Sequence, residues 1–401
     1  MLMKLYLFIT MAVLPALFLE GCETVDHTGE RGNDTGMAIP LDDVARLLSA
    51  LPLENEQMQE VHDAVTSSDG NGYDEEYRMT DLFVSPGAGV GTDEATRATK
   101  AGSYARPMKD LIAEYLSSRS KSGQQDAIPS PEEYMEALKN SDIQIYWPYS
   151  ENWDDKDWPV ITFDPGNGAE VNTGYRMYTN EDGSKAVEEV IVDEEMAATG
   201  SVWVVNRNTD SGYTSMEMRR RENPEWGTGG GMITIKPQGS TGTVKSLVMK
   251  DFMMRRKYDC WFAGASEFFV KCGSVEDFTA STEAELKLYS PKITDFMLVV
   301  KRSQVGQTIP LNVMLVSQWT DQLEDIAFMV TEDDGGTRTE WKCSATVKVK
   351  SKSYGFDIAL PFNTRDDIVW RGSLSAAYME KYDGMTNRFG DVDITFSFLE
   401  R

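Results

Sequence analysis

The spacing of apolar residues predicts helices in the first part of the chain. Between residues 39 and 67, apolar side chains recur every three or four positions and are interrupted once, at Pro52. This pattern is typical of two helices that pack as a hairpin. A third helix is expected over residues 107–118, and a fourth follows Ser130, where Ser-x-x-Glu has the pattern of a capping box. We therefore expect a small helical region over residues 39–140.

Beyond the helical region, the pattern changes to the two-residue period of strands. Residues 341–350 alternate strictly, with apolar side chains at odd positions and Lys, Ser or Thr at even ones. Residues 392–398 repeat this alternation, so the C-terminus is expected to lie within a sheet. Two more continuous apolar runs, at residues 294–301 and 311–317, are expected to form central strands. Turns rich in Asp, Asn and Gly are expected at residues 180–183 and 333–336.

These patterns predict a mainly β fold with a small α-helical N-terminal part and a β-sandwich-like C-terminal domain. Residues 224–243 are rich in Gly, Pro and Thr, which is typical of a boundary between domains. The predicted division is a helical region at residues 39–140, a β-rich middle domain at residues 141–243 and a β-sandwich domain at residues 244–401.

The first residues have the pattern of an export signal. Lys4 is followed by an apolar run that ends at Leu19 and is too short for a membrane-spanning helix. The sequence Leu19-Glu20-Gly21-Cys22 at its end resembles the lipobox of bacterial lipoproteins. In that family a lipid is attached to the cysteine, and the peptide before it is removed. The resemblance implies a signal peptide at residues 1–21 and a lipid anchor on Cys22, which makes a membrane one partner of the chain.

The segment after the cysteine has the composition of a flexible tether. Residues 22–38 are polar, rich in Gly and without periodicity. Glu23 stands where enteric lipoproteins of the inner membrane carry Asp, so the resemblance implies the outer membrane or the cell surface. The acidic tether is also similar to that of Bacteroidota-type surface lipoproteins. The alternative is a plain secretory signal with an unmodified Cys22.

Composition and missing motifs exclude several functions. Lys and Arg number 39 against 65 Asp and Glu, so the net charge is −26, and no nucleic acid partner is expected. The chain has two His residues and no HExxH, GxSxG or phosphate-loop motif. We therefore assign no catalytic residue, metal or cofactor and expect a binding or interaction module. A glycoside hydrolase that uses a carboxylate pair is a further alternative.

A run of aromatic residues among polar ones is the candidate ligand site. Aromatic faces stack on sugar rings, while carboxylates and amides accept hydrogen bonds from hydroxyl groups. A glycan-binding surface protein is therefore an alternative function, and another envelope protein is an alternative partner. Packing within the core is the competing interpretation of the same residues. The candidate residues are Trp147, Tyr149, Trp153 and Trp158.

Acidic pairs raise the question of calcium. Asp333-Asp334 and Asp366-Asp367 are expected in loops of the sandwich, where calcium often binds in such folds. Because the chain has so many acidic residues, chance pairs are expected, and we assign no metal ligands. The acidic segment at residues 69–76 fails the EF-hand pattern and is interpreted as a loop that ends a helix.

Cysteines and basic runs leave two smaller questions. Cys260 and Cys272 are far enough apart in sequence to face each other across a hairpin, so a disulfide and free thiols are both open. The basic runs at residues 219–221 and 255–257 are expected at solvated strand ends, with binding of an anionic partner as the alternative.

Overall fold

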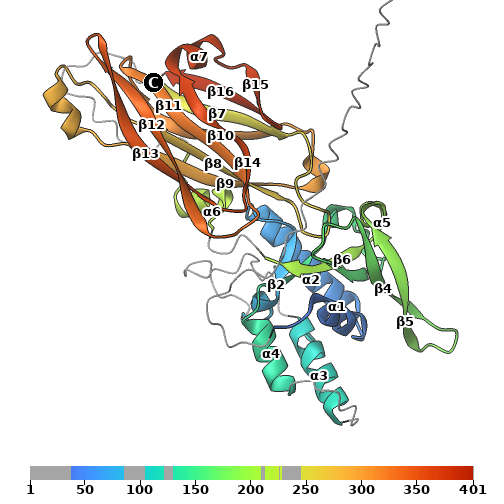
Figure 1. Ribbon diagram of the computed structural model, residues 1–401. Coiled ribbons are helices and arrows are strands. Elements are labelled where there is room, and N and C mark those ends of the chain that lie inside the picture. The colour runs from blue at the N-terminus through green and yellow to red at the C-terminus, as the bar shows by residue number, and fades with distance from the viewer. Residues whose placement is uncertain are drawn as a thin grey trace, which may run out of the picture.

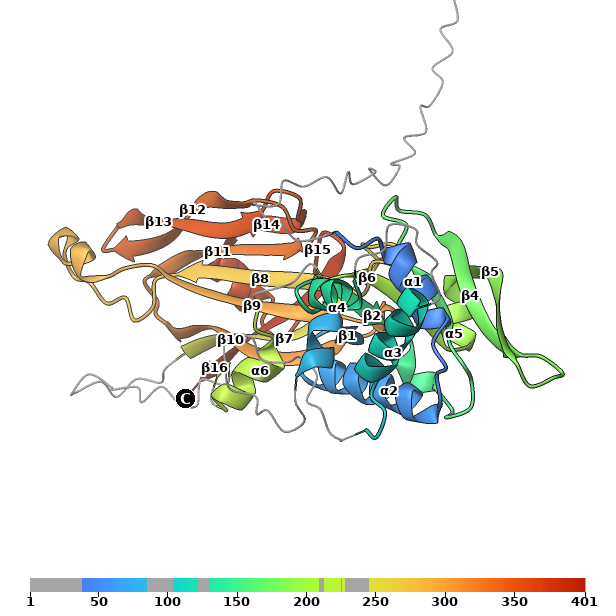
Figure 2. The same cartoon turned by 90° about the horizontal axis from the view of Figure 1, so that it is seen from below.

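The computed structural model describes residues 38–84, 104–121, 130–208, 213–224, 226–227 and 245–400. In these ranges the chain forms an N-terminal lobe of helices around a sheet and a C-terminal β-sandwich (Figures 1 and 2). The predicted mainly β fold, with helices near the N-terminus and a sandwich after them, is confirmed. The predicted signal peptide at residues 1–21, Cys22, the tether up to residue 37 and most of the boundary segment lie outside the described residues.

The helices of the N-terminal lobe follow the predicted apolar spacing. The backbone N–H of Glu133 donates to the Ser130 hydroxyl at 3.2 Å, and the Glu133 carboxylate accepts from the Ser130 N–H at 2.9 Å, which confirms the predicted capping box. No helix of the described ranges is long and apolar enough to cross a membrane. The four helices beside the sheet are α1 (Leu41–Ser49), α2 (Asn55–Gly70), α3 (Met108–Lys121) and α4 (Pro131–Lys139), and a short helix α5 (Glu194–Thr199) follows strand β5 (Lys185–Asp193).

A six-stranded sheet runs beside these helices. Its strand order is β1-β2-β6-β3-β4-β5, and neighbouring strands are antiparallel except for the parallel pair β3 and β6. Helices α1–α4 and one face of the sheet bury a single hydrophobic cluster, so residues 39–140 and 141–243 do not pack as the two separate units that the sequence predicts. The strands are β1 (Glu76–Arg78), β2 (Ile143–Tyr146), β3 (Val160–Phe163), β4 (Val171–Thr179), β5 (Lys185–Asp193) and β6 (Val202–Arg207).

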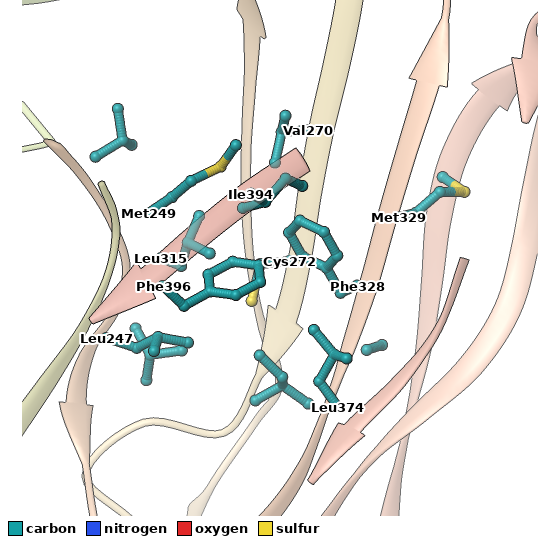
Figure 3. Close-up of a cluster of buried hydrophobic side chains, with 14 of the residues drawn as sticks. Leu247, Met249, Val270, Cys272, Leu315, Phe328, Met329, Leu374, Ile394 and Phe396 are labelled. Carbon is teal, nitrogen blue, oxygen red and sulfur yellow. The ribbon is translucent and has the colours of Figure 1, made fainter. Parts of the chain in front are cut away.

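The C-terminal lobe packs two antiparallel sheets face to face. One sheet has the order β10-β7-β16-β15, and the other has the order β13-β12-β11-β8-β9 with β14 paired to β11. Phe328 of one sheet meets Phe396 of the other, with ring centroids 5.2 Å apart (Figure 3). The strands are β7 (Lys245–Met254), β8 (Ser266–Ser274), β9 (Lys292–Val300), β10 (Ile309–Trp319), β11 (Leu323–Glu332), β12 (Arg338–Val349), β13 (Lys352–Asn363), β14 (Asp367–Ser375), β15 (Thr386–Phe389) and β16 (Val392–Glu400).

Most strand predictions for the sandwich are confirmed. Strand β12 buries Ala345, Val347 and Val349, the odd positions of the predicted alternation. Strand β16 lies inside its sheet, between β7 and β15. The prediction of central strands at residues 294–301 and 311–317 is wrong, because β9 and β10 are edge strands. The second half of β9, Phe296–Val300, is continuously apolar because the sandwich core covers one face, while helix α6 (Met216–Glu222) approaches the other.

Trp261 and Phe262 join the two lobes. They lie in the loop between β7 and β8, both have 0% of their surface exposed, and they pack on the sheet face that the helices leave open. The Trp261 indole donates to the Glu170 carbonyl at 3.0 Å, and the Asn206 amide donates to the Phe262 carbonyl at 3.1 Å. On the sheet, the cluster consists of Tyr146, Val160, Val192, Val202 and Val204.

The first basic run lies on a helix and serves the folded chain, whereas the second lies at an exposed strand end, directly after β7, as predicted. Arg221 lies on helix α6 and donates to the Gly70 carbonyl of α2 at 3.0 Å, and Arg220 donates to the Leu311 carbonyl of the sandwich at 2.6 Å. The first run therefore links the lobes, because cationic side chains satisfy the free carbonyls at the end of a helix. In the second run, Arg256 donates to Asp391 at 2.7 Å.

We predict that Trp261→Ala uncouples the lobes. The substitution empties the site between the loop and the sheet, so the free energy of unfolding should fall by about 3–5 kcal/mol. Urea unfolding followed by circular dichroism should change from one transition to two. Leu288→Ala is the control, because Leu288 is 73% exposed, and its free energy of unfolding should stay within about 0.5 kcal/mol of wild type. A Trp261→Ala curve that matches this control would contradict the prediction.

Candidate functional site

Two of the four predicted aromatic residues lie inside the N-terminal lobe. Trp147 is 1% exposed and packs edge-on against Trp203 of β6, with ring centroids 5.7 Å apart. Trp153 is half-buried, 5.5 Å from Trp147 and 4.8 Å from His62 of α2. These rings contact one another and leave Trp147 no face for a sugar. In the structure they are part of the core, which was the competing interpretation.

The other two predicted residues lie apart from this group. The Tyr149 hydroxyl donates to Glu194 at 2.9 Å, next to the cluster that holds Trp261. Trp158 exposes 43% of its surface, and the Lys185 ammonium lies 5.4 Å from its ring centroid. The structure therefore does not bring the four residues to one surface, and Trp158 is the member with a largely exposed ring.

Trp158 belongs to a larger group of exposed apolar residues. Strand β5 forms the outer edge of the six-stranded sheet, and the β4–β5 hairpin projects beyond the helices (Figure 1). Val187 and Ile191 point to one face of this hairpin because they are separated by even steps along the strand. Val171 shares this face, whereas Tyr178 pairs with Ala186 and points to the other face. We call the exposed apolar residues of both faces, together with the nearby Trp158, the hairpin surface: Trp158 (43% exposed), Val171 (50%), Tyr178 (44%), Val187 (43%) and Ile191 (66%).

A separate cluster of carboxylates lies at the end of the sandwich, next to the loop that carries Trp261. We call it the carboxylate cluster, and it consists of Asp259, Glu267 and Glu332. Each offers a carboxylate oxygen that lies within 4.8 Å of those of the other two. Glu332 is 1% exposed, and its Oε1 has no hydrogen-bond partner. Asp259 and Glu267 are half-buried, so the cluster is accessible from one side.

Strand register brings the chain segments of Glu267 and Glu332 side by side at the end of the ladder, although the Glu267 side chain leaves β8 on the opposite face from Phe268. Glu332 pairs directly with Phe268 of β8 and with Asp367 of β14, so it takes the face of the sheet that carries Phe268, at the last position of β11. Glu267 is the neighbour of Phe268, and its carbonyl accepts from the Asp333 N–H at 2.9 Å, where the ladder ends. The loop between β7 and β8 brings Asp259 to the same place.

The acidic loops predicted from the sequence surround this cluster. The Asn363 side chain donates to Asp333 at 3.1 Å, and its backbone donates to Asp366 at 2.8 Å, so the two loops are hydrogen-bonded together. The sequence analysis found these pairs but missed the carboxylate cluster itself. The sequence did contain one indication of the cluster. Glu332 directly precedes Asp333-Asp334 and has the same parity along the strand as Phe328 and Val330, so its side chain is expected to point inward.

The carboxylates of this region repel one another. Burial raises the pKa of Asp259 to about 6, although hydrogen bonding to Glu332 and the charge of Arg302 oppose the change. Burial, followed by the charge of Asp259, raises the pKa of Glu332 well above its usual range. Burial and the same neighbour raise the pKa of Asp334 to about 7. Arg302 donates to the Asp259 carbonyl at 3.2 Å, but its guanidinium pairs with Glu194 at 2.8 Å.

The acidic segment at residues 69–76 has a different role, because it is hydrogen-bonded into the junction between the lobes. Asp74 accepts from the Ala265 N–H at 2.9 Å. Glu75 is 3% exposed and accepts from the Ser150 N–H at 3.0 Å and the Ser150 hydroxyl at 2.6 Å. Burial raises the pKa of Glu75 to about 8, and the charge of Lys301 and the Ser150 hydrogen bond oppose this rise.

The cysteines of the described ranges are free. Cys272 lies in the sandwich core, and Cys260 packs near Trp261, so the disulfide that the sequence left open is not formed in the structure. Burial raises the pKa of the Cys260 thiol to about 12, which disfavours a reactive thiolate.

Burial also argues against a hydrolytic role for the carboxylate cluster. A glycosidase needs two carboxyl groups that touch the sugar on both sides of the bond it cleaves. Glu332 is 1% exposed and cannot reach a polymer in this conformation, whereas a single ion is small enough to contact it. Comparison with protein-family models, with curated proteins and with solved structures found no match. Function is therefore inferred from the geometry and the sequence motifs.

We predict that Glu75→Gln removes part of the pH dependence of stability. Folded Glu75 keeps its proton up to about pH 8, whereas the unfolded carboxyl loses it near its ordinary value of 4.5. The contribution of Glu75 to the free energy of unfolding is therefore complete below pH 4.5 and is lost as the pH rises towards 8. Glutamine stays neutral, so the melting temperature of the variant should rise relative to wild type between pH 5 and pH 8.

Thermal unfolding over this pH range tests the prediction about Glu75. Glu136→Gln is the control, because Glu136 is exposed on helix α4 and its removal should leave the wild-type slope unchanged. Parallel pH curves for Glu75→Gln and wild type would contradict the assignment of a proton to folded Glu75.

Proposed function

We propose that the chain is a lipid-anchored protein of the outer membrane or cell surface that binds a partner protein through its hairpin surface. The lipobox-like sequence ending at Cys22 and the polar tether after it support the anchor. Two or more acyl chains hold a protein stably at a membrane. The concentration of exposed apolar side chains on the hairpin carries the binding role, because soluble proteins rarely leave such patches uncovered unless they bind something.

The chemistry of the hairpin indicates what kind of partner fits. Strand β5 has an open edge in the described part of the chain, and such an edge can accept an extended segment as a further strand. Residues 170–193 carry six carboxylates against two basic side chains, a net charge of −4. We therefore propose a partner segment that alternates apolar and basic side chains. Its apolar residues would cover Val187 and Ile191 on one face, and its basic residues would lie beside Glu188 on the other face.

A glycan ligand is the second candidate, and one observation favours it. Trp158 is exposed and stands beside the Tyr178 strand, so an aromatic face is available for stacking on a sugar. The other predicted aromatic residues are buried or engaged elsewhere, as described above. This makes a glycan site smaller than the sequence suggested and leaves a protein partner as the first proposal.

We predict that Cys22→Ala prevents lipid attachment. The thiol of Cys22 is the acceptor in a lipobox, and alanine offers no nucleophile for the acyl-bearing group. In a bacterial host that labels lipoproteins with radioactive palmitate, wild-type protein should carry label and sediment with membranes. The variant should carry none. Cys260→Ala is the matched control and should be labelled like wild type. A labelled Cys22→Ala protein, or an unlabelled wild type, would contradict the lipid anchor.

We predict that a photo-crosslinking amino acid at Ile191 captures a protein partner in intact cells, whereas the same group at Met385 does not. Both positions are exposed, at 66% and 55%, but Met385 lies on the sandwich. The captured protein should then bind the purified chain, and the double substitution Glu188→Lys and Glu189→Lys should weaken this binding about tenfold. Retardation of the chain in a polysaccharide gel that Trp158→Ala relieves would favour the glycan instead. Equal capture at both positions would contradict the hairpin surface.

A further inference from the structure

Glu332 poses a specific physical problem. It is 1% exposed, its Oε1 has no hydrogen-bond partner, and carboxylate oxygens of Asp259 and Glu267 lie within 4.8 Å. A buried carboxylate normally accepts hydrogen bonds or pairs with a cation. The guanidinium of Arg302, whose charge acts on Asp259, is already paired with Glu194. An oxygen that is buried and unpartnered beside two further carboxylates is the arrangement expected of a cation ligand.

We propose that Asp259, Glu267 and Glu332 form a binding site for a calcium ion. This site is separate from the hairpin surface and goes beyond the proposed function. Nothing in the proposal depends on the lipid anchor or on the identity of a partner protein. It assigns a role to three residues that neither the motifs nor the acidic pairs in the sequence had indicated.

The spacing of the oxygens fits calcium. Calcium–oxygen distances are about 2.3–2.6 Å, so two ligands on opposite sides of the ion lie about 4.6–5.2 Å apart and adjacent ligands lie closer. Three oxygens within 4.8 Å of one another can therefore all reach one calcium ion. Magnesium needs ligands at about 2.0–2.1 Å in a near-ideal octahedron and keeps several of its waters, so a site of three carboxylates on separate segments suits the more flexible coordination of calcium better.

The ligand chemistry points the same way. The cluster offers carboxylate oxygens without an imidazole or a thiolate, and this set favours hard cations over zinc or copper. Asp367 pairs with Glu332 across the strands, and the charges of Asp334 and Asp367 act on this region. Asp259 and Glu267 are half-buried, so water can complete the coordination from the open side. Calcium takes six to eight oxygen ligands, and this mixture of carboxylates and water supplies them.

Calcium at this site would also act on the junction between the lobes. Glu267 and Glu332 are fixed by strand pairing, whereas Asp259 is carried by the loop that inserts Trp261 and Phe262 into the N-terminal sheet. An ion that draws Asp259 towards the strands would hold the start of that loop in place. Binding should therefore stabilise the contact between the lobes as well as the cluster itself.

The experiment uses the purified full-length protein after treatment with EDTA. Its melting temperature should rise when calcium is added in millimolar excess and should rise less with magnesium. Terbium, which replaces calcium and emits light when nearby aromatic residues are excited, should show sensitised emission that calcium displaces. Tyr258 and Trp261 flank Asp259 in the sequence and supply the excitation.

Glu332→Gln identifies the site. Glutamine keeps the shape of the side chain but removes its charge, so calcium affinity should fall by more than the roughly tenfold loss seen for outer-shell partners of metal sites. Without calcium, the variant should be at least as stable as wild type, because one of three repelling carboxylates is gone. Glu340→Gln, an exposed carboxylate on β12, is the matched control and should respond to calcium like wild type. If Glu332→Gln fails to fold, Asp259→Asn tests the same site at a half-buried position.

Three outcomes would overturn the proposal. The first is the absence of any calcium-dependent change in wild type, which would mean that the carboxylates are held together by a shared proton. The second is an equal response in wild type and in both cluster variants, which would place calcium elsewhere. The third is a calcium response that depends on Glu340 and not on Glu332.

Discussion

The insertion of Trp261 and Phe262 into the N-terminal sheet is the contact on which the arrangement of the molecule depends. Helices α1–α4 cover one face of that sheet, and without another cover Val202, Val204 and Tyr146 would face water. The sandwich supplies the cover through a loop and not through one of its sheets. Both lobes can therefore keep complete cores of their own while burying the remaining face of the sheet between them.

Charged residues around this apolar contact are placed so that each is compensated. Glu194, just after β5, accepts from Arg302 at 2.8 Å and from Lys257 at 2.6 Å, both of which belong to the sandwich. Burial raises the pKa of Glu194, but these hydrogen bonds outweigh it and bring the pKa to about 2. Lys301, the neighbour of Arg302, pairs with Asp69 at 3.2 Å. A half-buried ion pair of this kind contributes orientation more than stability, since desolvation offsets much of its attraction.

Local sequence patterns predicted the helices and strands well, whereas features that depend on contacts between distant residues were not predicted. The capping box at Ser130 and the alternation in β12 depend on neighbouring residues, so the sequence alone was sufficient to find them. The position of β9 at a sheet edge was not predicted. A continuous apolar run indicates that both faces of a strand are buried, but it does not indicate whether the strand has a neighbour on each side. Trp147 was read as a ligand candidate because a single sequence does not show that Trp203 and His62 pack against it. The carboxylate cluster joins residues from positions 259 to 332, and it takes the pairing of β8 with β11 and the path of the β7–β8 loop to bring them together.

Asp259 belongs both to the carboxylate cluster and to the loop that carries Trp261, so each of them constrains its position. Pairing of β8 with β11 fixes Glu267 and Glu332 whatever their charge, because backbone hydrogen bonds set the positions of both. Asp259 has no such ladder, so its position depends on its hydrogen bond to Glu332 and on the charges around it. Two residues later, the buried Trp261 holds the same loop against the sheet. The charge on the cluster therefore acts on the loop that enters the N-terminal sheet, and compensation of that charge, by a proton or by a cation, determines how tightly the loop is held.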